Sequence, residues 1–284
     1  MNSAITYPVI PDEREDDLHG LEDLDRAKLV IFMAGNQFMA MEALIAAFRA
    51  RCPDIGPIYY ETLPPKMELR QILAGGAMFR GRLIDINADV YTSVSFQGVE
   101  TLAAANLADT KDCCVYLRNR IALMVPAGNP ESIEQVSDLA RAGLRVSQPS
   151  LAHEDIADHI LAMYRRAGGE ELVRTIMTDK RNRGETLLTT VHHRETPERI
   201  LSGQADAGPV WATEIEHARR NGLPLDSIEV GPELDQRDRV KYYVCPLRNG
   251  HNPKNGRRFL EFLQSAEAQG IFRRYGFTPI LDTD

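Results

Sequence analysis

The sequence lacks a long apolar run, an excess of basic residues and any familiar catalytic motif. No stretch approaches the roughly 20 consecutive apolar residues of a membrane-spanning helix, so we do not expect a membrane-embedded protein. Acidic residues outnumber basic ones by 41 to 33, which gives a net charge of −8, whereas a nucleic-acid binder needs clustered Lys and Arg. A nucleophile elbow, a Walker loop and a zinc-protease motif are also missing. We therefore expect neither a nucleic-acid partner nor an enzyme.

The beginning of the chain lacks the basic start and the apolar run of about 7–15 residues that mark a secretory signal. Residues 12–17 instead read Asp-Glu-Arg-Glu-Asp-Asp. On this N-terminus alone we expect a cytoplasmic protein. Residues 1–26 also show no sustained hydrophobic period, so we expect them to form an extension ahead of the folded part.

Cysteine is scarce, and the four residues present show no metal-finger spacing. They are Cys52, Cys113, Cys114 and Cys245. The adjacent pair Cys113-Cys114 could form a vicinal disulfide or a soft-metal site. The alternative is two small apolar residues entering a strand, because free cysteine is usually just buried.

The first half of the chain alternates short apolar runs with segments of helical period. We expect strands at 28–33, 57–62 and 88–93, separated by helices at 38–51 and 68–73. The order β-α-β-α-β implies parallel strands joined by right-handed crossovers. In such sheets a ligand binds beyond the carboxyl ends of the strands, at the loops that open helices.

The second half begins another β-α series and ends on an amphipathic helix. Expected strands lie at 121–125, 144–147, 205–211 and 240–245, and a helix lies at 155–166. Residues 255–275 should form one helix with Phe259, Phe262, Leu263, Ile271 and Phe272 on its apolar face.

Four motifs point to a known family. They are Phe-Leu-Glu-Phe-Leu-Gln-Ser-Ala-Glu-Ala-Gln-Gly-Ile-Phe-Arg-Arg-Tyr-Gly-Phe-Thr-Pro at 259–279, Gly-Gln-Ala-Asp-Ala-Gly-Pro-Val-Trp-Ala at 203–212, the strand segment 118–130 and Ala-Asp-Val-Tyr-Thr-Ser at 88–93. In this order the motifs resemble the type II periplasmic solute-binding proteins of the molybdate group, which are the substrate-binding components of ABC importers. The resemblance covers residues 28–279.

The resemblance implies an α/β fold of two lobes, each a mostly parallel sheet flanked by helices, with two crossing strands as the hinge. Lobe one would comprise 27–118 plus 243–284, and lobe two 119–242, with crossings near Asn119 and Tyr242. It further implies a monomer without cofactor that captures a molybdate-, tungstate- or sulfate-like oxyanion in the cleft for an ABC permease. A processed form of the chain would then be periplasmic.

Two loops of lobe one match ligand loops of the family. In loop one, residues 33–37, Gly35, Asn36 and Gln37 stand in the place of an Ala-Ala-Ser turn, with Asn36 at the anion-binding serine. As a plain helix cap, Asn36 would need no ligand. In loop two, residues 63–67, Pro65 and Lys66 replace two serines. Proline offers no N–H, and Lys66 either supplies a full charge or is a solvated residue at a helix start.

Two positions of lobe two also match. In loop three, residues 149–154, Ala152 and His153 replace part of a Pro-Ala-Gly turn, where the family offers only backbone to the ligand; a surface histidine is more often idle. Trp211 stands where the family has a tyrosine that reaches into the cleft. Its indole offers one N–H donor, and as the chain's only tryptophan it is equally suited to the core.

Loop four, residues 190–197, departs most from the family. Arg194 could grip an oxyanion with two hydrogen bonds. Alternatively His192, His193 and Glu195, with His153 added from loop three, could coordinate a transition metal. His192, His193 and Arg194 could also hold a small anionic metabolite. The same clamshell could then serve as a cytoplasmic ligand sensor. A structural salt-bridge network is the third interpretation of this loop.

Overall fold

A computed structural model describes residues 6–152, 154–190 and 194–280. The chain divides into two compact units. Unit 1 takes the chain up to Leu117, Lys241–Arg274 and the residues from Thr278 on, and unit 2 takes Arg118–Val240 with Tyr275–Phe277. The chain therefore leaves unit 1 near Asn119 and returns to it at Lys241.

Unit 1 is built on a seven-stranded sheet in the order β1-β3-β2-β6-β13-β7-β14. β2 pairs in parallel with β3 and β6, whereas β1 and β13 pair antiparallel with β3 and β6. The sheet is thus mixed, whereas we expected a mostly parallel one. β13 runs antiparallel to β6 because the chain forms it on returning from unit 2. The strands are β1 (Leu18–His19), β2 (Leu29–Phe32), β3 (Ile58–Glu61), β6 (Val90–Ser93), β7 (Cys114–Arg118), β13 (Lys241–Pro246) and β14 (Thr278–Pro279).

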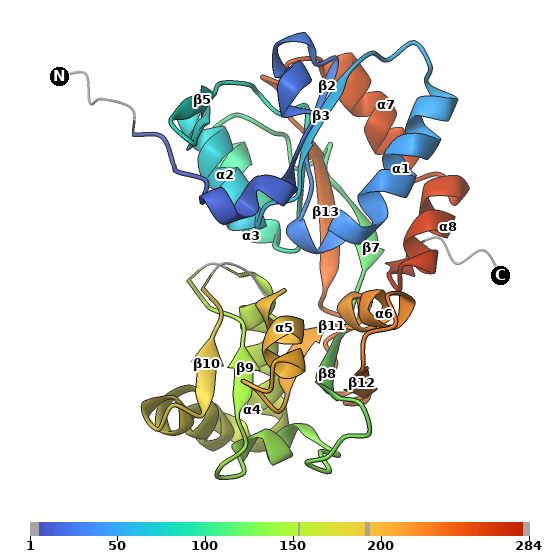
Figure 1. Cartoon of the computed structure of the whole chain (residues 1–284). Coiled ribbons are helices and arrows are strands. Elements are labelled where there is room, and N and C mark those ends of the chain that lie inside the picture. Colours follow the sequence, from blue (N-terminus) through green and yellow to red (C-terminus); the bar gives the residue numbers. More distant parts are fainter. Residues whose placement is uncertain (1–5, 153, 191–193, 281–284) are drawn as a thin grey trace. The chain divides into compact units, whose positions relative to one another are not determined.

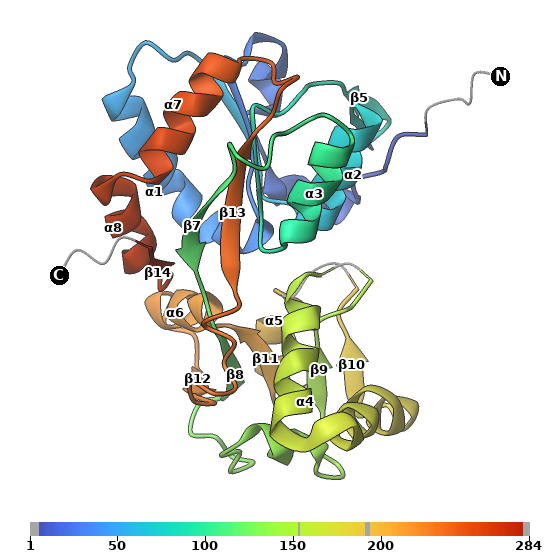
Figure 2. The same cartoon turned by 180° about the vertical axis from the view of Figure 1, so that it is seen from behind.

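Helices cover both faces of this sheet, as Figures 1 and 2 show. On one side lie α1 (Phe38–Arg51), α7 (Pro253–Leu263) and α8 (Ala266–Arg274), and on the other α2 (Pro65–Ala74) and α3 (Phe96–Ala104). Burial from both sides explains why β2 is apolar at all four positions.

The single helix expected at 255–275 was wrong, because α7 ends before α8 begins. Ser265 lies between them, and its Oγ accepts the backbone N–H of Ala268 at 3.3 Å. A serine in this position satisfies a donor of a new helix and so starts α8. The last helices pack on unit 1, since the Phe48 ring of α1 lies 5.1 Å from that of Phe259 and 5.4 Å from that of Phe262.

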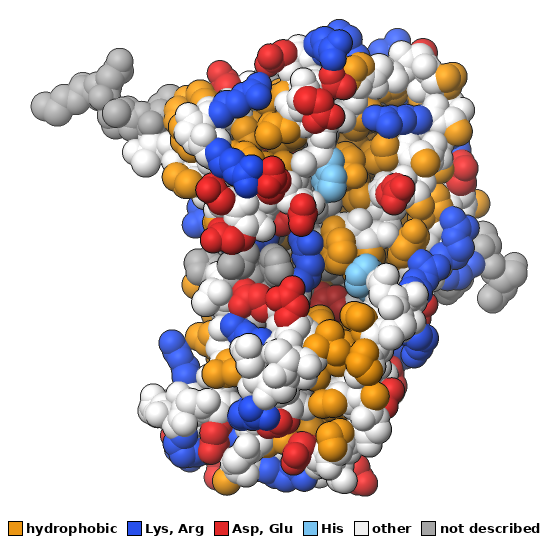
Figure 3. Space-filling model, viewed as in Figure 1, with side chains coloured by type: hydrophobic (Ala, Val, Ile, Leu, Met, Phe, Trp, Pro, Cys, Tyr) orange, Lys and Arg blue, Asp and Glu red, His pale blue; other side chains and the backbone are white. Residues whose placement is uncertain are grey.

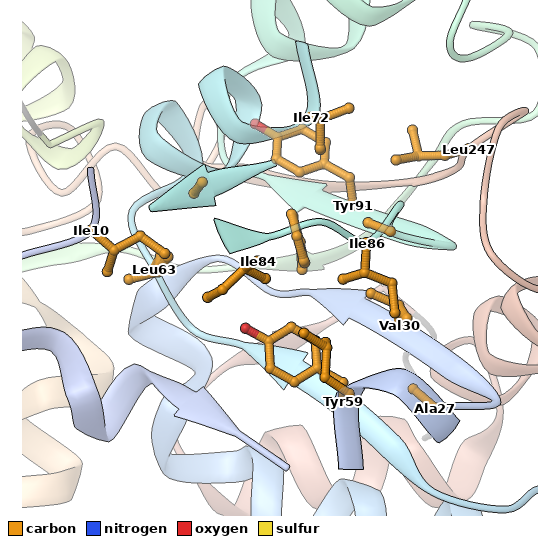
Figure 4. Close-up of a cluster of buried hydrophobic side chains, with 14 of the residues drawn as sticks. Ile10, Ala27, Val30, Tyr59, Leu63, Ile72, Ile84, Ile86, Tyr91 and Leu247 are labelled. Carbon is orange, nitrogen blue, oxygen red and sulfur yellow. The ribbon is translucent and has the colours of Figure 1, made fainter. Parts of the chain in front are cut away.

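The segment expected as an N-terminal extension is built into unit 1. It contains η1 (Asp12–Asp17), β1 and η2 (Leu21–Arg26). Ile10 and Leu24 are buried in the same apolar cluster as Val30 and Tyr59 of the sheet, part of which Figure 4 shows. The hairpin of β4 (Ala77–Phe79) and β5 (Arg82–Ile84) completes this cluster. The segment therefore lacks hydrophobic periodicity but still supplies core residues.

Unit 2 has a smaller sheet with α4 on one face and α5 on the other (Figures 1 and 2). β8 pairs antiparallel with β11 and β12, β9 pairs in parallel with β10, and a bridge from Val146 to Ala207 joins the two parts. The elements are β8 (Ile121–Pro126), η4 (Val136–Ala140), β9 (Val146–Gln148), α4 (Ile156–Arg174), η5 (Thr175–Lys180), β10 (Thr186–Leu188), α5 (Glu195–Leu201), β11 (Gly208–Trp211), α6 (Ala212–Arg220) and β12 (Leu225–Ile228).

A disulfide joins Cys113 to Cys245, and Cys52 and Cys114 are free. The vicinal disulfide and the soft-metal site expected for Cys113-Cys114 were therefore wrong, because Cys113 bonds to Cys245, whereas Cys114 enters strand β7 as the alternative expected. Neighbouring residues of a strand point to opposite faces, whereas Cys113 and Cys245 come from adjoining strand segments with their Cα atoms 4.5 Å apart, within the range a disulfide spans.

The surface carries charges of both signs. Figure 3 shows Lys and Arg side chains interspersed with Asp and Glu on the visible face of each unit. Within the described part of the chain, no helix has both the length and the apolar character that crossing a bilayer would require.

Candidate functional site

Loops one and two lie against each other in unit 1. Gly35 makes this possible, because a Cβ at this position would lie 2.9 Å from the carbonyl oxygen of Thr62 and 3.2 Å from that of Leu63. Only glycine permits so close a backbone approach without displacement. The structure therefore brings together the loop of Asn36 and Gln37 and the loop of Lys66.

Asn36 and Gln37 are buried at the start of α1, with 3% and 0% of their surface exposed. The interpretation of Asn36 as a plain cap was wrong, because Gln37 is the N-cap residue of α1 and Ala34 that of the preceding turn. The Asn36 amide instead donates to the Tyr242 hydroxyl. The Gln37 carbonyl accepts the Tyr116 hydroxyl at 2.8 Å, and its Nε2 has no hydrogen-bond partner among the described residues.

Tyr116 and Tyr242 support these two amides from the adjoining strands β7 and β13. Their ring centroids are 6.4 Å apart in an edge-to-face arrangement. Burial is the main cause that raises the pKa of Tyr116 far above its ordinary value, so its hydroxyl remains a hydrogen-bond donor at any physiological pH. The motifs did not identify Tyr116, and β7 offers no period-2 signal for it, because Tyr116 and its neighbour Leu117 are both buried.

Loop two opens α2 with Pro65 at the first turn, a position where its missing N–H has no cost. The carbonyl oxygen of Pro65 accepts the Tyr91 hydroxyl at 3.0 Å. Lys66 follows as the second residue of α2 and is half-buried, and Glu68 is fully buried in the same turn. A ligand at this loop would therefore lie near a lysine and a buried carboxyl group.

Loops three and four come together in unit 2 through the Thr189 side chain. The Ser150 backbone N–H donates to Thr189 Oγ1 at 3.0 Å, and that hydroxyl donates to Glu154. Ala152 is exposed, and its N–H donates to Ser150 Oγ at 3.3 Å. His153 lies outside the described residues, so its role stays a hypothesis.

Loop four is held by Glu195. This carboxylate accepts the Thr190 backbone N–H at 2.9 Å and pairs with Arg199 at 2.8 Å, which favours a structural network for this residue. Arg194 directly precedes α5, and its charge contributes to the lowered pKa of His217, for which burial is the main cause.

The metal hypothesis depends on residues beyond the described ones. His192 and His193 lie outside the described residues, and a metal would have to draw Glu195 from its present partners. Within the described ranges, no group of three His, Cys, Asp or Glu residues is arranged to hold a metal ion. Binding through these histidines therefore stays a hypothesis.

Trp211 closes β11 and is 2% exposed. Its ring centroid lies 5.9 Å from that of His159 in α4. Burial lowers the pKa of His159, which keeps the imidazole neutral near pH 7. This packing favours the core interpretation of Trp211. The sequence reasoning missed His159, which no motif marks.

The family model for bacterial extracellular solute-binding proteins matches residues 29–278. Among curated proteins, the molybdate-binding protein ModA of Mycobacterium tuberculosis is 22% identical over 88% of this chain and 84% of its own length. The putative ABC transporter substrate-binding lipoprotein YvgL of Bacillus subtilis is 23% identical over 67% of each chain.

A solved structure shows the same fold. The sulfate-binding protein SubI of M. tuberculosis has a TM-score of 0.72 at 19% identity, covering 90% of this chain and 88% of its own. The resemblance that the four motifs predicted, with its two-lobed periplasmic-binding-protein fold, is confirmed. The chain belongs to the bacterial extracellular solute-binding protein family, is similar in sequence to a molybdate-binding protein and shares the fold of a sulfate-binding protein.

Proposed function

We propose that this protein captures a small anion of the molybdate, tungstate or sulfate class and delivers it to an ABC importer. The relatives named above support both parts of this proposal, since one binds molybdate, one binds sulfate and one is named as a component of an ABC transporter.

The observation that carries the proposal is the buried Nε2 of Gln37. A buried donor without a partner costs on the order of 1–3 kcal/mol, and few such groups persist in folded proteins without a reason. It lies at the start of α1, where helix backbone N–H groups also favour negative charge. An anion oxygen would satisfy this donor.

A carboxyl group near loop two bears on which groups bind the anion. Glu68 is buried in the first turn of α2. Nearby carboxylates oppose an anion electrostatically, so we infer that neutral donors such as the Gln37 amide make most of its hydrogen bonds.

We propose that the protein works outside the cytoplasm. The Cys113–Cys245 disulfide supports this location, because disulfides persist in oxidising compartments and are rare in the cytosol. Labelling of cell fractions with a thiol-reactive reagent tests it. Cys113 and Cys245 should resist labelling until a reductant is added, and a fully labelled cytosolic pool would contradict the proposed location.

A ligand screen tests the function. Molybdate, tungstate, sulfate, phosphate and divalent metals are added one at a time, and thermal unfolding is measured. A ligand present at about 100 times its Kd should stabilise the protein by roughly 2.7 kcal/mol. We expect an oxyanion to do so without any metal. Stabilisation by metals alone would instead favour the site of His192, His193 and Glu195.

The Gln37→Glu variant tests whether the buried Nε2 of Gln37 donates to the anion. It keeps the oxygen that accepts the Tyr116 hydroxyl but replaces the free donor by an acceptor of negative charge. We expect anion affinity to fall at least about 100-fold, equivalent to about 2.7 kcal/mol, by calorimetry. Asn249→Asp is the control, since it makes the same change at an exposed position of unit 1. Equal losses in both variants would contradict a local role for Gln37.

A further inference from the structure

The N-terminal segment lies outside the stretch that the family model matches, which begins at residue 29. Nevertheless it reaches the candidate site. β1 lies antiparallel on β3, with Leu18 opposite Glu61. Its pairing therefore brings the preceding turn η1 to the carboxyl end of β3, where loop two begins.

Asp17 ties this segment to loop two. Its backbone carbonyl accepts the Thr62 N–H at 2.9 Å, and its Oδ1 accepts the Thr62 hydroxyl at 3.1 Å. Arg14 in turn donates from Nη1 to Asp17 Oδ2 at 3.2 Å. Both side chains are 2% exposed, so the segment places a guanidinium in the interior next to loop two.

Thr62 also adjoins loop one, because its carbonyl oxygen would lie 2.9 Å from a Cβ placed on Gly35. Arg14 is thus connected through Asp17 and Thr62 to the loop of Asn36 and Gln37. Figure 1 shows the dark-blue N-terminal segment beside α2, at the end of the unit 1 sheet where α1 starts.

We propose that Arg14 is a specificity-determining residue for the anion, and that Asp17 is the ion-pair partner with which the anion competes for it. This rests on the proposed function. Loop two opens α2 with Pro65 and Lys66, so it offers no side-chain hydroxyl at this helix start, and Pro65 offers no N–H. A buried guanidinium supplies several fixed donors together with a positive charge, and that charge offsets the nearby carboxylates.

Two substitutions separate this role from a merely structural ion pair. Arg14→Gln and Asp17→Asn each break the same pair, so a structural role predicts similar losses of anion affinity in both. A ligand-directed role predicts opposite results. Arg14→Gln should weaken binding of the oxyanion found in the screen at least about tenfold, because a charge-assisted bond is lost. Asp17→Asn should bind as tightly as the parent or more tightly, because a competing negative charge is gone.

Calorimetry with molybdate and sulfate measures the affinities, and denaturation checks that each variant folds. Arg14→Lys serves if Arg14→Gln does not fold, and it should bind more weakly than the parent because lysine lacks the planar fork. Arg80→Gln is the matched control, since Arg80 pairs with Glu15 of the same segment at the surface; its affinity should change less than about twofold.

The outcomes are distinct. If the parent binds an oxyanion and Arg14→Gln and Arg14→Lys bind it equally well, the role of Arg14 is overturned and the proposed function stands. Equal losses in Arg14→Gln and Asp17→Asn also overturn it. If the parent binds no oxyanion at all, the proposed function fails and the role of Arg14 fails with it.

Discussion

Loop one of unit 1 is held by neutral groups, whereas loops three and four of unit 2 are held by carboxylates. In loop one the Asn36 and Gln37 amides meet two tyrosine hydroxyls. In unit 2, Glu154 accepts the Thr189 hydroxyl and Glu195 accepts the Thr190 N–H. The comparison teaches that loop one keeps a buried donor, the Gln37 Nε2, without a partner among the described residues, while Glu154 and Glu195 already accept hydrogen bonds within unit 2.

The test with the largest expected effect removes the disulfide, which joins two residues of unit 1. Replacing Cys113 and Cys245 by alanine should lower the free energy of unfolding of unit 1 by about 2–5 kcal/mol, since the disulfide closes a long loop in the unfolded chain. Trp211 is the only tryptophan and lies in unit 2, so its fluorescence reports unit 2 while circular dichroism reports both units.

We expect circular dichroism to show an earlier transition in this variant and the Trp211 transition to stay in place. Cys114→Ser is the control, because Cys114 is free and adjacent to the disulfide. Coincident shifts of both probes would mean that the units unfold as one and that the comparison between them does not extend to stability.

The next test is the response to pH. Burial is the main cause that raises the pKa of Glu61 in unit 1 to about 7. The folded protein therefore holds a proton that the unfolded chain releases near pH 4.5, and stability should fall by about 3 kcal/mol as the pH rises from about 4.5 to 7. Glu61→Gln keeps the oxygen that Tyr59 and Gln71 bind and should abolish this fall.

Unit 2 should respond in the opposite direction. The hydrogen bond from Arg183 is the main cause that lowers the pKa of Glu185 to about 2. Its stabilising contribution is complete above about pH 4.5 and is lost as the pH falls towards 2. Denaturation curves at several pH values, followed by Trp211 fluorescence and by circular dichroism, distinguish the two responses. If stability changed with pH in the same way by both probes, the predicted difference between unit 1 and unit 2 would be contradicted.

The smallest expected effect is the loss of stability when a contact between loops three and four is removed. Glu154→Ala removes the acceptor of the buried Thr189 hydroxyl, which should destabilise unit 2 by about 1–3 kcal/mol. Trp211 fluorescence during denaturation measures this loss. Glu171→Ala, at an exposed position of α4, should change stability by less than about 0.5 kcal/mol. If both variants behave alike, Glu154 does not hold the loops.

The parts of the fold with a strong local signal were predictable. β2 is an unbroken apolar run, and four motifs in the family's order, the last at 259–279, together indicated the family. β1 was missed because a strand of two residues has no period of its own. The partner of Cys113 was missed because it lies 132 residues away, and spacing does not determine disulfide connectivity.

The candidate site was predictable in its loops but not in its contacts. Positions matched to the family identified Asn36 and Gln37. Their partners Tyr242 and Tyr116 lie 206 and 79 residues away along the chain, and only the order of strands in the sheet brings them near. The motifs also gave no reason to propose Arg14, since the segment that carries it has no counterpart in them.

The two-residue strand β1 also has a consequence for self-association. β3 would otherwise be the outermost strand of the unit 1 sheet, and an open edge exposes unpaired N–H and C=O groups that can template pairing with another chain. Leu18 and His19 occupy that edge, and the His19 ring stacks on Tyr60 with centroids 4.2 Å apart. The N-terminal segment thus protects the sheet from edge-to-edge aggregation.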